Sequence, residues 1–308
     1  MRDVLVTLAE LAASVAVGIA IQQTRHGPQA LRAGWFLSFS VLGPVVTFYA
    51  FSTIALDDRT ALMAGLAALT VWSTLGVGYL YGSLVGRDLT ERAALAISIG
   101  FSNTGFVGYI LAQTLFGRRG LQLMVFYDQI AFMIPAISIS TAIVRVHAGT
   151  TVTDRHLASD FLRRLLVNPP LAGTLVALAL RLVDVRMPGL LGPLGIGIVH
   201  TVGPLGFLVV GLSVPLGRLA LEQGEVVRGV GAMAVRYLVG PCLLALWALV
   251  LGLGAPTTFY LATVLPAATH LLVLSRLYSL RPPLIRLLVV VTTVLSVTGA
   301  FVYAAVRS

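Results

Sequence analysis

Polar and helix-breaking residues interrupt two long apolar stretches of the chain, and they are the first candidates for chemistry. The candidates are Asn103, Thr104, Gly105 and Gly108 in the first stretch and Pro266, Thr269 and His270 in the second. Backbone groups freed by such breaks are costly inside a bilayer unless they line a cavity or meet a ligand. Paired breaks at corresponding places in two halves indicate a binding site between them. We therefore predict that these residues bind a substrate; close helix packing through small residues is the alternative.

A carboxylate, Asp128, lies inside another apolar stretch, beside Gln129. A buried carboxylate must pair with a partner, bind a cation or stay protonated. Ionisable groups inside a membrane mark ion or proton pathways by default. We predict that Asp128 and Gln129 bind a coupling proton or sodium ion, with His270 as the partner of Asp128. The alternative is a structural pair between Asp128 and a histidine or Arg236.

Three further polar residues are secondary candidates for the site: Arg236, His200 and Glu10. Arg236 lies inside an apolar stretch and is expected to extend its long side chain to the membrane surface. Glu10 lies near the end of a stretch, where it is expected to reach the surface or cap a helix. His200 precedes Gly203 and Pro204, so it either lines the cavity or packs between helices.

The composition places the chain in a membrane. It has 308 residues, of which 57% are hydrophobic and 11% are charged, whereas a soluble domain carries about 25% charged residues. The net charge is +9, and all 21 basic residues are arginines, which lie between apolar runs and form no nucleic-acid-binding stripe. No Cys/His cluster has metal-ligand spacing, and the only cysteine, Cys242, is expected to be buried. We predict a membrane protein surrounded by lipid, with no metal, no cofactor and no nucleic-acid partner.

Ten stretches are long and apolar enough to be transmembrane helices, since about 20 apolar residues cross the hydrocarbon core. The stretches are residues 4–22, 33–55, 60–86, 92–116, 120–146, 166–183, 193–217, 226–253, 258–277 and 284–306. A shift of about 160 residues superposes the first five on the last five, and an odd number per half makes an inverted repeat. The expected fold is all-α and polytopic, with ten transmembrane helices as two inverted five-helix repeats in which helices 4 and 9 are broken and cross.

The expected boundaries are a first repeat at 1–147, a polar linker at 148–164 and a second repeat at 165–308, together forming one membrane domain. Alternate sides of the ten spans carry thirteen and seven arginines, with Arg236 inside a span. Loops rich in arginine stay in the cytoplasm. We therefore expect a plasma-membrane protein with a cytoplasmic linker and both termini on the extracytoplasmic side.

The two breaks also indicate the charge of the substrate. Helices 4 and 9 are expected to run in opposite directions, and a new half-helix begins after each break. Two helix N-termini then point toward the middle of the membrane, each carrying about half a positive charge and unpaired amides. An anionic group is the natural partner of such helix ends.

Four motifs, taken in order, resemble the auxin efflux carrier family of permeases. They are Phe101-Ser-Asn-Thr-Gly-Phe-Val-Gly-Tyr-Ile-Leu with Leu115-Phe-Gly117, Arg164-Leu-Leu-Val-Asn-Pro-Pro-Leu, Thr201-Val-Gly-Pro-Leu-Gly-Phe-Leu, and Leu265-Pro-Ala-Ala-Thr-His. The resemblance runs over nearly the whole chain. It implies the ten-span fold, a scaffold domain, a moving transport domain and elevator-type alternating access. It also implies a small organic anion as substrate.

The family usually has a proline in the first crossing where this chain has Ile110, so the first break is expected to rest on Gly105 and Gly108. We predict a secondary transporter, not an enzyme, that moves a small organic anion by alternating access. A membrane sensor that binds its ligand without moving it is the alternative. An intramembrane enzyme is a remote one, because aspartyl chemistry needs two carboxylates in one site and no second Asp follows a Gly-x-Gly sequence. The sequence leaves open the coupling ion, the direction of transport and the formation of a homodimer.

Overall fold

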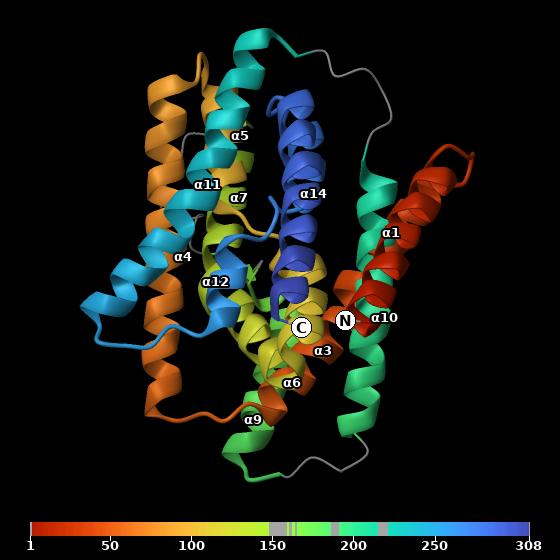
Figure 1. Cartoon of the computed structure of the whole chain (residues 1–308), viewed down its shortest axis with the longest axis vertical. Helices are drawn as coiled ribbons and strands as arrows, with labels where there is room; N and C mark the ends of the chain where they lie inside the picture. The colour runs from red at the N-terminus through yellow and green to blue at the C-terminus, as the bar shows by residue number, and fades with distance from the viewer. Residues whose placement is uncertain are drawn as a thin grey trace.

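The structure is a computed structural model that describes residues 2–147, 159, 162–163, 165–185, 191–214 and 221–307. Over these residues the chain is helical, and its one extended pairing is an isolated bridge between Ser102 and Ala267 (Figure 1). Most of the expected linker, 148–164, lies outside the described residues.

The first part of the chain forms a series of helices that pass back and forth along the long axis of the molecule (Figure 1). Its elements are α1 (Arg2–Gln22), α2 (Gly27–Trp35), η1 (Phe36–Leu42), α3 (Gly43–Thr53), α4 (Asp58–Val85), α5 (Leu89–Gly100), η2 (Thr104–Gly108), α6 (Tyr109–Tyr127), η3 (Asp128–Phe132) and α7 (Met133–His147). The three elements labelled η are wider, π-helical turns that continue directly into α-helices. Such turns are frequent at functional sites.

The second part of the chain is also helical, and it too contains an interrupted stretch. Its elements are α9 (Pro169–Leu182), α10 (Leu191–Ser213), α11 (Gln223–Val250), α12 (Thr257–Thr263), α13 (His270–Leu277) and α14 (Pro282–Arg307). The two short helices, α12 and α13, lie in the stretch that the sequence marked at residues 258–277, with a gap between them at residues 264–269.

Five helical stretches of the described residues are long and apolar enough to cross a membrane. They are Gly27–Thr53, Asp58–Val85, Thr104–Ile139, Gln223–Val250 and Pro282–Val306. Shorter apolar helices cover Ala9–Gln22, Pro169–Leu182 and His200–Ser213. The chain is therefore a multi-pass, all-helical membrane protein over the described residues. The count of ten spans and the inverted repeat stay predictions, because several of the expected spans are short or interrupted.

Local signals in the sequence set the ends of several helices. The side chain of Asp57 accepts a hydrogen bond from the Thr60 amide at the start of α4, and Asp88 caps α5 through the Glu91 amide. Gly117 divides α6 into two helical segments, because its φ of 64° and ψ of −158° leave the helix. A residue with a side chain would be strained in that conformation.

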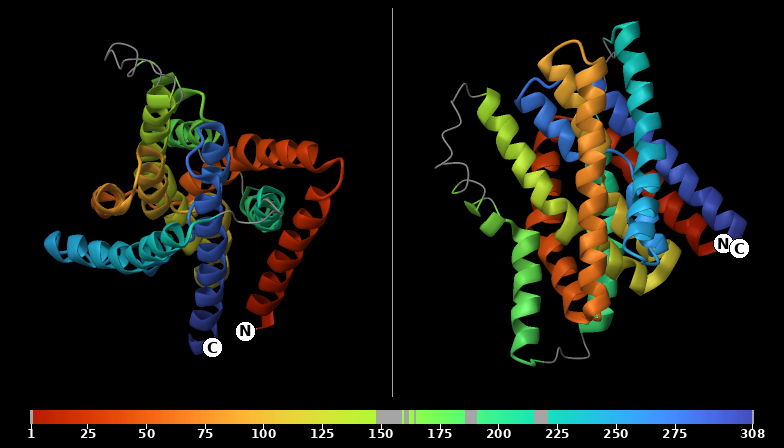
Figure 2. Two further views of the ribbon diagram at one scale, coloured as in Figure 1. Left: turned by 90° about the horizontal axis from the view of Figure 1, so that it is seen from above. Right: turned by 90° about the vertical axis from the view of Figure 1, so that its left-hand side faces the viewer.

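By their contacts the helices form two groups. In one group α1 lies along α10 and α3 lies along α9, while in the other α4 lies along α5 and α11. The contact between α1 and α10 is close, since a Cβ atom on Gly18 would lie 2.3 Å from the carbonyl oxygen of Leu208. Small residues allow membrane helices to approach this closely. The two ends of the described chain lie side by side (Figure 2).

Candidate functional site

Both interrupted stretches contain a gap between helices. Helix α5 ends at Gly100, and residues 101–103 are not helical before η2 begins at Thr104. Helix α12 ends at Thr263, and α13 begins at His270. Most residues in these gaps are buried, so their backbone groups need partners inside the protein.

The two gaps supply each other with those partners. The amide of Asn103 donates to the carbonyl of Pro266 at 2.8 Å, and the amide of Ala268 donates to the carbonyl of Phe101 at 3.0 Å. Two segments from opposite halves of the chain, residues 101–103 and 264–269, therefore pair through their backbones. We call this pairing the crossing. The pairing satisfies groups that would otherwise be costly inside a membrane.

The first gap lies earlier than the sequence indicated. The family pattern placed a break on Gly105 and Gly108, but both glycines lie in η2, which continues into α6 at Tyr109. The gap forms at residues 101–103 because their backbone pairs with the second segment. Gly108 instead permits close packing, since a Cβ atom there would lie 2.6 Å from Cδ1 of Leu265.

A cavity of about 670 Å³ lies beside the crossing. The sequence candidates that line it are Asn103, Thr104, Gly105, Thr269, His270 and Asp128. Gly108, Pro266 and Gln129 are buried and do not line it. Aromatic side chains form much of the remaining wall, including Trp35, whose ring lies edge-on to that of Phe106 at 5.2 Å between centroids. Among the described residues of the wall, Asp128 is the only charged side chain.

Asn103 connects both crossing segments through its side chain. Its Nδ2 donates to Oγ1 of Thr269 at 2.6 Å, and its Oδ1 accepts from the Phe106 amide at 3.3 Å. The second contact caps η2, as an Asn side chain commonly does at the start of a helix. Asn103 thus holds the start of η2 against the segment that leads into α13.

Asp128 is 6% exposed and accepts hydrogen bonds from three neutral donors. Tyr109 donates to Oδ2 at 2.6 Å, Gln129 donates to the same oxygen at 2.9 Å, and Thr104 donates to Oδ1. The expected pairing with His270 is therefore not what surrounds the carboxylate, nor does a described arginine pair with it. Sequence reading missed Tyr109, although this residue ends the same polar motif that contains Thr104.

The expectation that Arg236 reaches the membrane surface is wrong. Its side chain is 2% exposed and points from α11 into the crossing. It donates to six oxygen atoms, which are the carbonyls of Ser98, Ile99, Phe101, Leu265 and Pro266 and the hydroxyl of Ser102. A buried arginine is tolerated only where hydrogen-bond partners replace water, and the crossing supplies them.

The other candidates lie in different surroundings. His270 is half-buried at the start of α13, with its ring 5.8 Å from that of Phe101. His200 and Glu10 are exposed on α10 and α1, outside the cavity. Cys242 is exposed as well, against the expectation of burial, because it lies on the outward face of α11. No group of His, Cys, Asp and Glu within the described residues is arranged to hold a metal ion.

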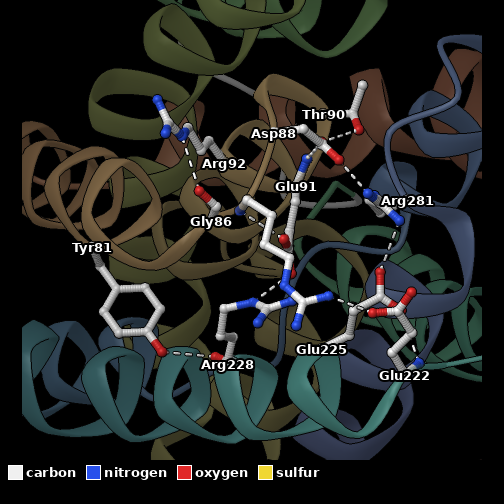
Figure 3. A network of polar contacts seen from close by, with 11 residues as sticks. Tyr81, Gly86, Asp88, Thr90, Glu91, Arg92, Glu222, Glu225, Arg228 and Arg281 are labelled. Carbon is white, nitrogen blue, oxygen red and sulfur yellow. Dashed lines mark hydrogen bonds and ion pairs between the residues drawn. The ribbon is translucent and has the colours of Figure 1, made fainter.

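A network of charged side chains lies apart from the crossing, near the starts of α5, α11 and α14 (Figure 3). Its members are the acids Asp88, Glu91, Glu222 and Glu225 and the bases Arg87, Arg228 and Arg281. Nε of Arg228 lies 2.6 Å from Glu91, and Nη1 of Arg281 lies 3.1 Å from Glu225. The network joins the turn before α5, the start of α11 and the turn before α14. Sequence reading had treated these arginines only as signals of topology.

Asp88 is the best-defined member of this network. Hydrogen bonds from the Thr90 hydroxyl and the Glu91 amide, together with Arg281, hold the pKa of Asp88 well below its usual range. The contact with Asp88 in turn raises the pKa of Arg281. Both shifts favour the charged forms, and the ion pair joins the turn before α5 to the turn before α14.

Apolar helices long enough to cross a membrane, packed around a polar crossing and a cavity, define a multi-pass membrane protein. The chain belongs to the membrane transport protein family, which is the auxin efflux carrier family, since the family's model matches residues 37–304. The resemblance seen in the four motifs is thereby confirmed. No curated protein matches the chain.

Proposed function

We propose that the protein is a secondary transporter that moves a small organic anion across the plasma membrane by alternating access. The observation that carries this proposal is the cavity beside the crossing, at which polar residues from both interrupted stretches meet. Membership of a transport family supports the movement of a substrate rather than its chemical conversion. Asp128 is the only carboxylate among the described residues of the wall, and aspartyl chemistry needs a pair.

The helix ends at the cavity favour an anion. The elements η2 and α13 begin at Thr104 and His270, and both residues line the cavity. Helix N-termini carry partial positive charge and present amides to a ligand. The side-chain amide of Asn103 and the hydroxyl of Thr269 are further polar groups at the wall of the cavity. The aromatic wall would enclose the carbon skeleton of the substrate.

Asp128 is the proposed point of coupling to a cation, with a proton favoured over sodium. The carboxylate accepts from Thr104, the first residue of η2, so it already draws on the positive end of that helix. A substrate anion would compete for the same potential, and uptake of a proton by Asp128 would remove the competition. Binding of the proton and binding of the substrate thereby favour each other, and coupled transport requires such linkage.

Movement is proposed to occur between the two groups of helices. Helix α10 of the first group packs on η2 and α6, which follow α5 of the second group in the chain. There Gly203 faces Ile110 and Gly206 faces Phe106, so α10 presents no side chain at these two positions. We propose that this contact is the surface along which a transport domain moves against a scaffold. Two inverted repeats, ten spans and extracytoplasmic termini complete the proposal.

A flux measurement tests the proposal directly. Purified protein in liposomes is offered radiolabelled small mono- and dicarboxylates, with and without an inward proton gradient. We expect saturable uptake of at least one of these anions, reduced about tenfold by Asn103→Ala, which corresponds to about 1.4 kcal/mol of lost stabilisation. Gln22→Ala is the matched control, because Gln22 bonds the Leu212 carbonyl away from the cavity. Specific binding with no flux would support a sensor instead.

A further inference from the structure

The guanidinium of Arg236 holds the two crossing segments together. Nη1 donates to Ile99 at 2.6 Å and to Ser98 at 2.9 Å, both at the end of α5. Nη2 donates to Leu265 at 2.6 Å and Nε to the same carbonyl at 3.0 Å, just after α12. An arginine has five N–H donors and no acceptor, so six oxygen atoms occupy all of them.

The charge of Arg236 is balanced by the backbone. No carboxylate in the described part of the chain forms an ion pair with it. Its carbonyl partners lie at the end of α5, where the last carbonyls lack acceptor bonds within the helix, and in the gap after α12, at Leu265 and Pro266. The C-terminus of α5 carries roughly half a negative charge, and the dipoles of the loop carbonyls of Leu265 and Pro266 add negative potential beside the guanidinium.

Five carbonyl oxygens and one hydroxyl around a single buried point also form a ligand set that suits a metal cation. Unwound backbone carbonyls and the C-terminal ends of half-helices are the groups with which transporters of broken-helix design bind sodium. The oxygen atoms converge here in the same way, with Arg236 already at their centre.

We propose that Arg236 acts as a tethered cation that takes the place of a metal ion at the crossing. The crossing is then assembled at all times, and transport does not depend on sodium. This inference rests on the proposed function for its transport consequence, but its structural part does not. It assigns Arg236 as a positioning residue and leaves the coupling of transport to Asp128.

The first experiment measures stability, so it does not require a known substrate. Thermal unfolding of the purified protein is followed in choline chloride, in sodium chloride, and with guanidinium on the order of 10 mM, at which a bound ion stabilises by mass action. The wild-type protein should unfold at the same temperature in all three. Arg236→Ala should unfold at a lower temperature in choline and recover with guanidinium. Arg181→Ala, which removes a half-buried arginine from carbonyls at the end of α3, should show no recovery.

A second pair of variants separates charge from packing if Arg236→Ala does not fold. Arg236→Lys keeps the positive charge, whereas Arg236→Met keeps a similar length without it. The Lys variant should be the more stable, and its uptake should stay independent of sodium. Equal stability of the Lys and Met variants would overturn the proposal, as would a folded Arg236→Ala that guanidinium does not stabilise.

The transport consequence is tested on the wild-type protein in liposomes. Replacing sodium with choline at constant proton gradient should leave uptake unchanged, whereas a drop of about tenfold would overturn the proposal. If no anion is transported but guanidinium still rescues Arg236→Ala, the proposed function fails while the role of Arg236 stands.

Discussion

Asn103 and Thr269 are separated by 166 positions in the sequence, yet Nδ2 of Asn103 lies 2.6 Å from Oγ1 of Thr269 inside the protein. The contact joins the two interrupted stretches at the wall of the cavity. Because both side chains also face the cavity, this pair couples the shape of the crossing to whatever the cavity binds.

The first prediction concerns this pair. Asn103→Ala and Thr269→Ala should each reduce uptake about tenfold while leaving folded protein in the membrane largely unchanged, because a buried hydrogen bond contributes only about 0.5–1.5 kcal/mol. The double variant should be little worse than either single one, since residues in one contact are not additive. Uptake and fluorescence-detected size-exclusion chromatography report the two quantities. Parallel loss of uptake and of folded protein would indicate that the pair serves packing.

Pro266→Ala should also impair uptake more than membrane expression. Pro266 has no amide to donate, and its carbonyl accepts from Asn103 and from Arg236. An alanine allows the chain to continue the helix from α12 and thereby pulls that carbonyl away from the crossing. The measurement compares initial uptake rates at matched amounts of folded protein, with Pro241→Ala in the middle of α11 as a control. Equal effects at Pro266 and Pro241 would contradict the prediction.

Asp128→Asn should preserve the fold and flatten the pH dependence of uptake. An asparagine keeps an acceptor for Tyr109 or Thr104 but cannot take up a proton. Uptake is measured between about pH 5 and pH 8 with no membrane potential. The Gln129→Glu variant is a second probe, because it places a new titratable group beside Asp128. A pH profile of Asp128→Asn that matches the wild type would make Asp128 structural.

Asp88→Asn should lower stability at neutral pH by weakening the ion pair with Arg281. The pKa of Asp88 is depressed in the folded protein, so its contribution is fully present above the unfolded pKa of about 3.9 and is lost as the pH falls below it. The difference in melting temperature between the wild type and Asp88→Asn should therefore be constant from about pH 7 to pH 5 and shrink below about pH 4. High salt should reduce it too.

Asp57→Asn is the control for that measurement. Asp57 also caps a helix, but within the described residues it makes no ion pair. Its effect on the melting temperature should therefore respond less to salt than that of Asp88→Asn. Equal salt sensitivity of the two variants would mean that Asp88 acts only as a cap.

A cysteine-labelling experiment tests the proposed topology. In a Cys242→Ala background, single cysteines replace Ser159 in the linker region and Ser308 at the C-terminus. The arginine asymmetry predicts that an impermeant thiol reagent labels the second site in intact cells and spares the first. Removing Cys242 is necessary because its side chain is exposed. The opposite labelling pattern would invert the orientation.

The position of the site could be predicted from the sequence, because its signals are local. Asn103 and Pro266 stand among other polar and helix-breaking residues inside apolar stretches, and this clustering marked the two stretches that meet. Asp128 was marked in the same way, as an ionisable residue in an apolar run. Each of these inferences needed only the residue type and its apolar neighbours.

The partners within the site could not be predicted, because they depend on the path of the backbone. Arg236 binds carbonyl oxygens, which every residue has and which no sequence pattern distinguishes. Asp128 contacts Tyr109 rather than His270 because Gly117 turns the chain between them. The charged network joins Asp88 to Arg281, which are 193 positions apart. The sequence showed only that both residues lie in polar segments between apolar stretches.

Main-chain atoms take part in most of the bonds that hold the crossing, and this separates assembly from selectivity. The hydrogen bonds from Asn103 to Pro266 and from Ala268 to Phe101 join backbone amides to backbone carbonyls. Arg236 also donates to backbone carbonyls. Side chains that line the cavity but make no hydrogen bond between the two segments, such as those of Thr104 and His270, can therefore be exchanged without removing these main-chain bonds. A protein with this division can acquire a new substrate by exchanging wall residues one at a time, each step passing through a folded intermediate.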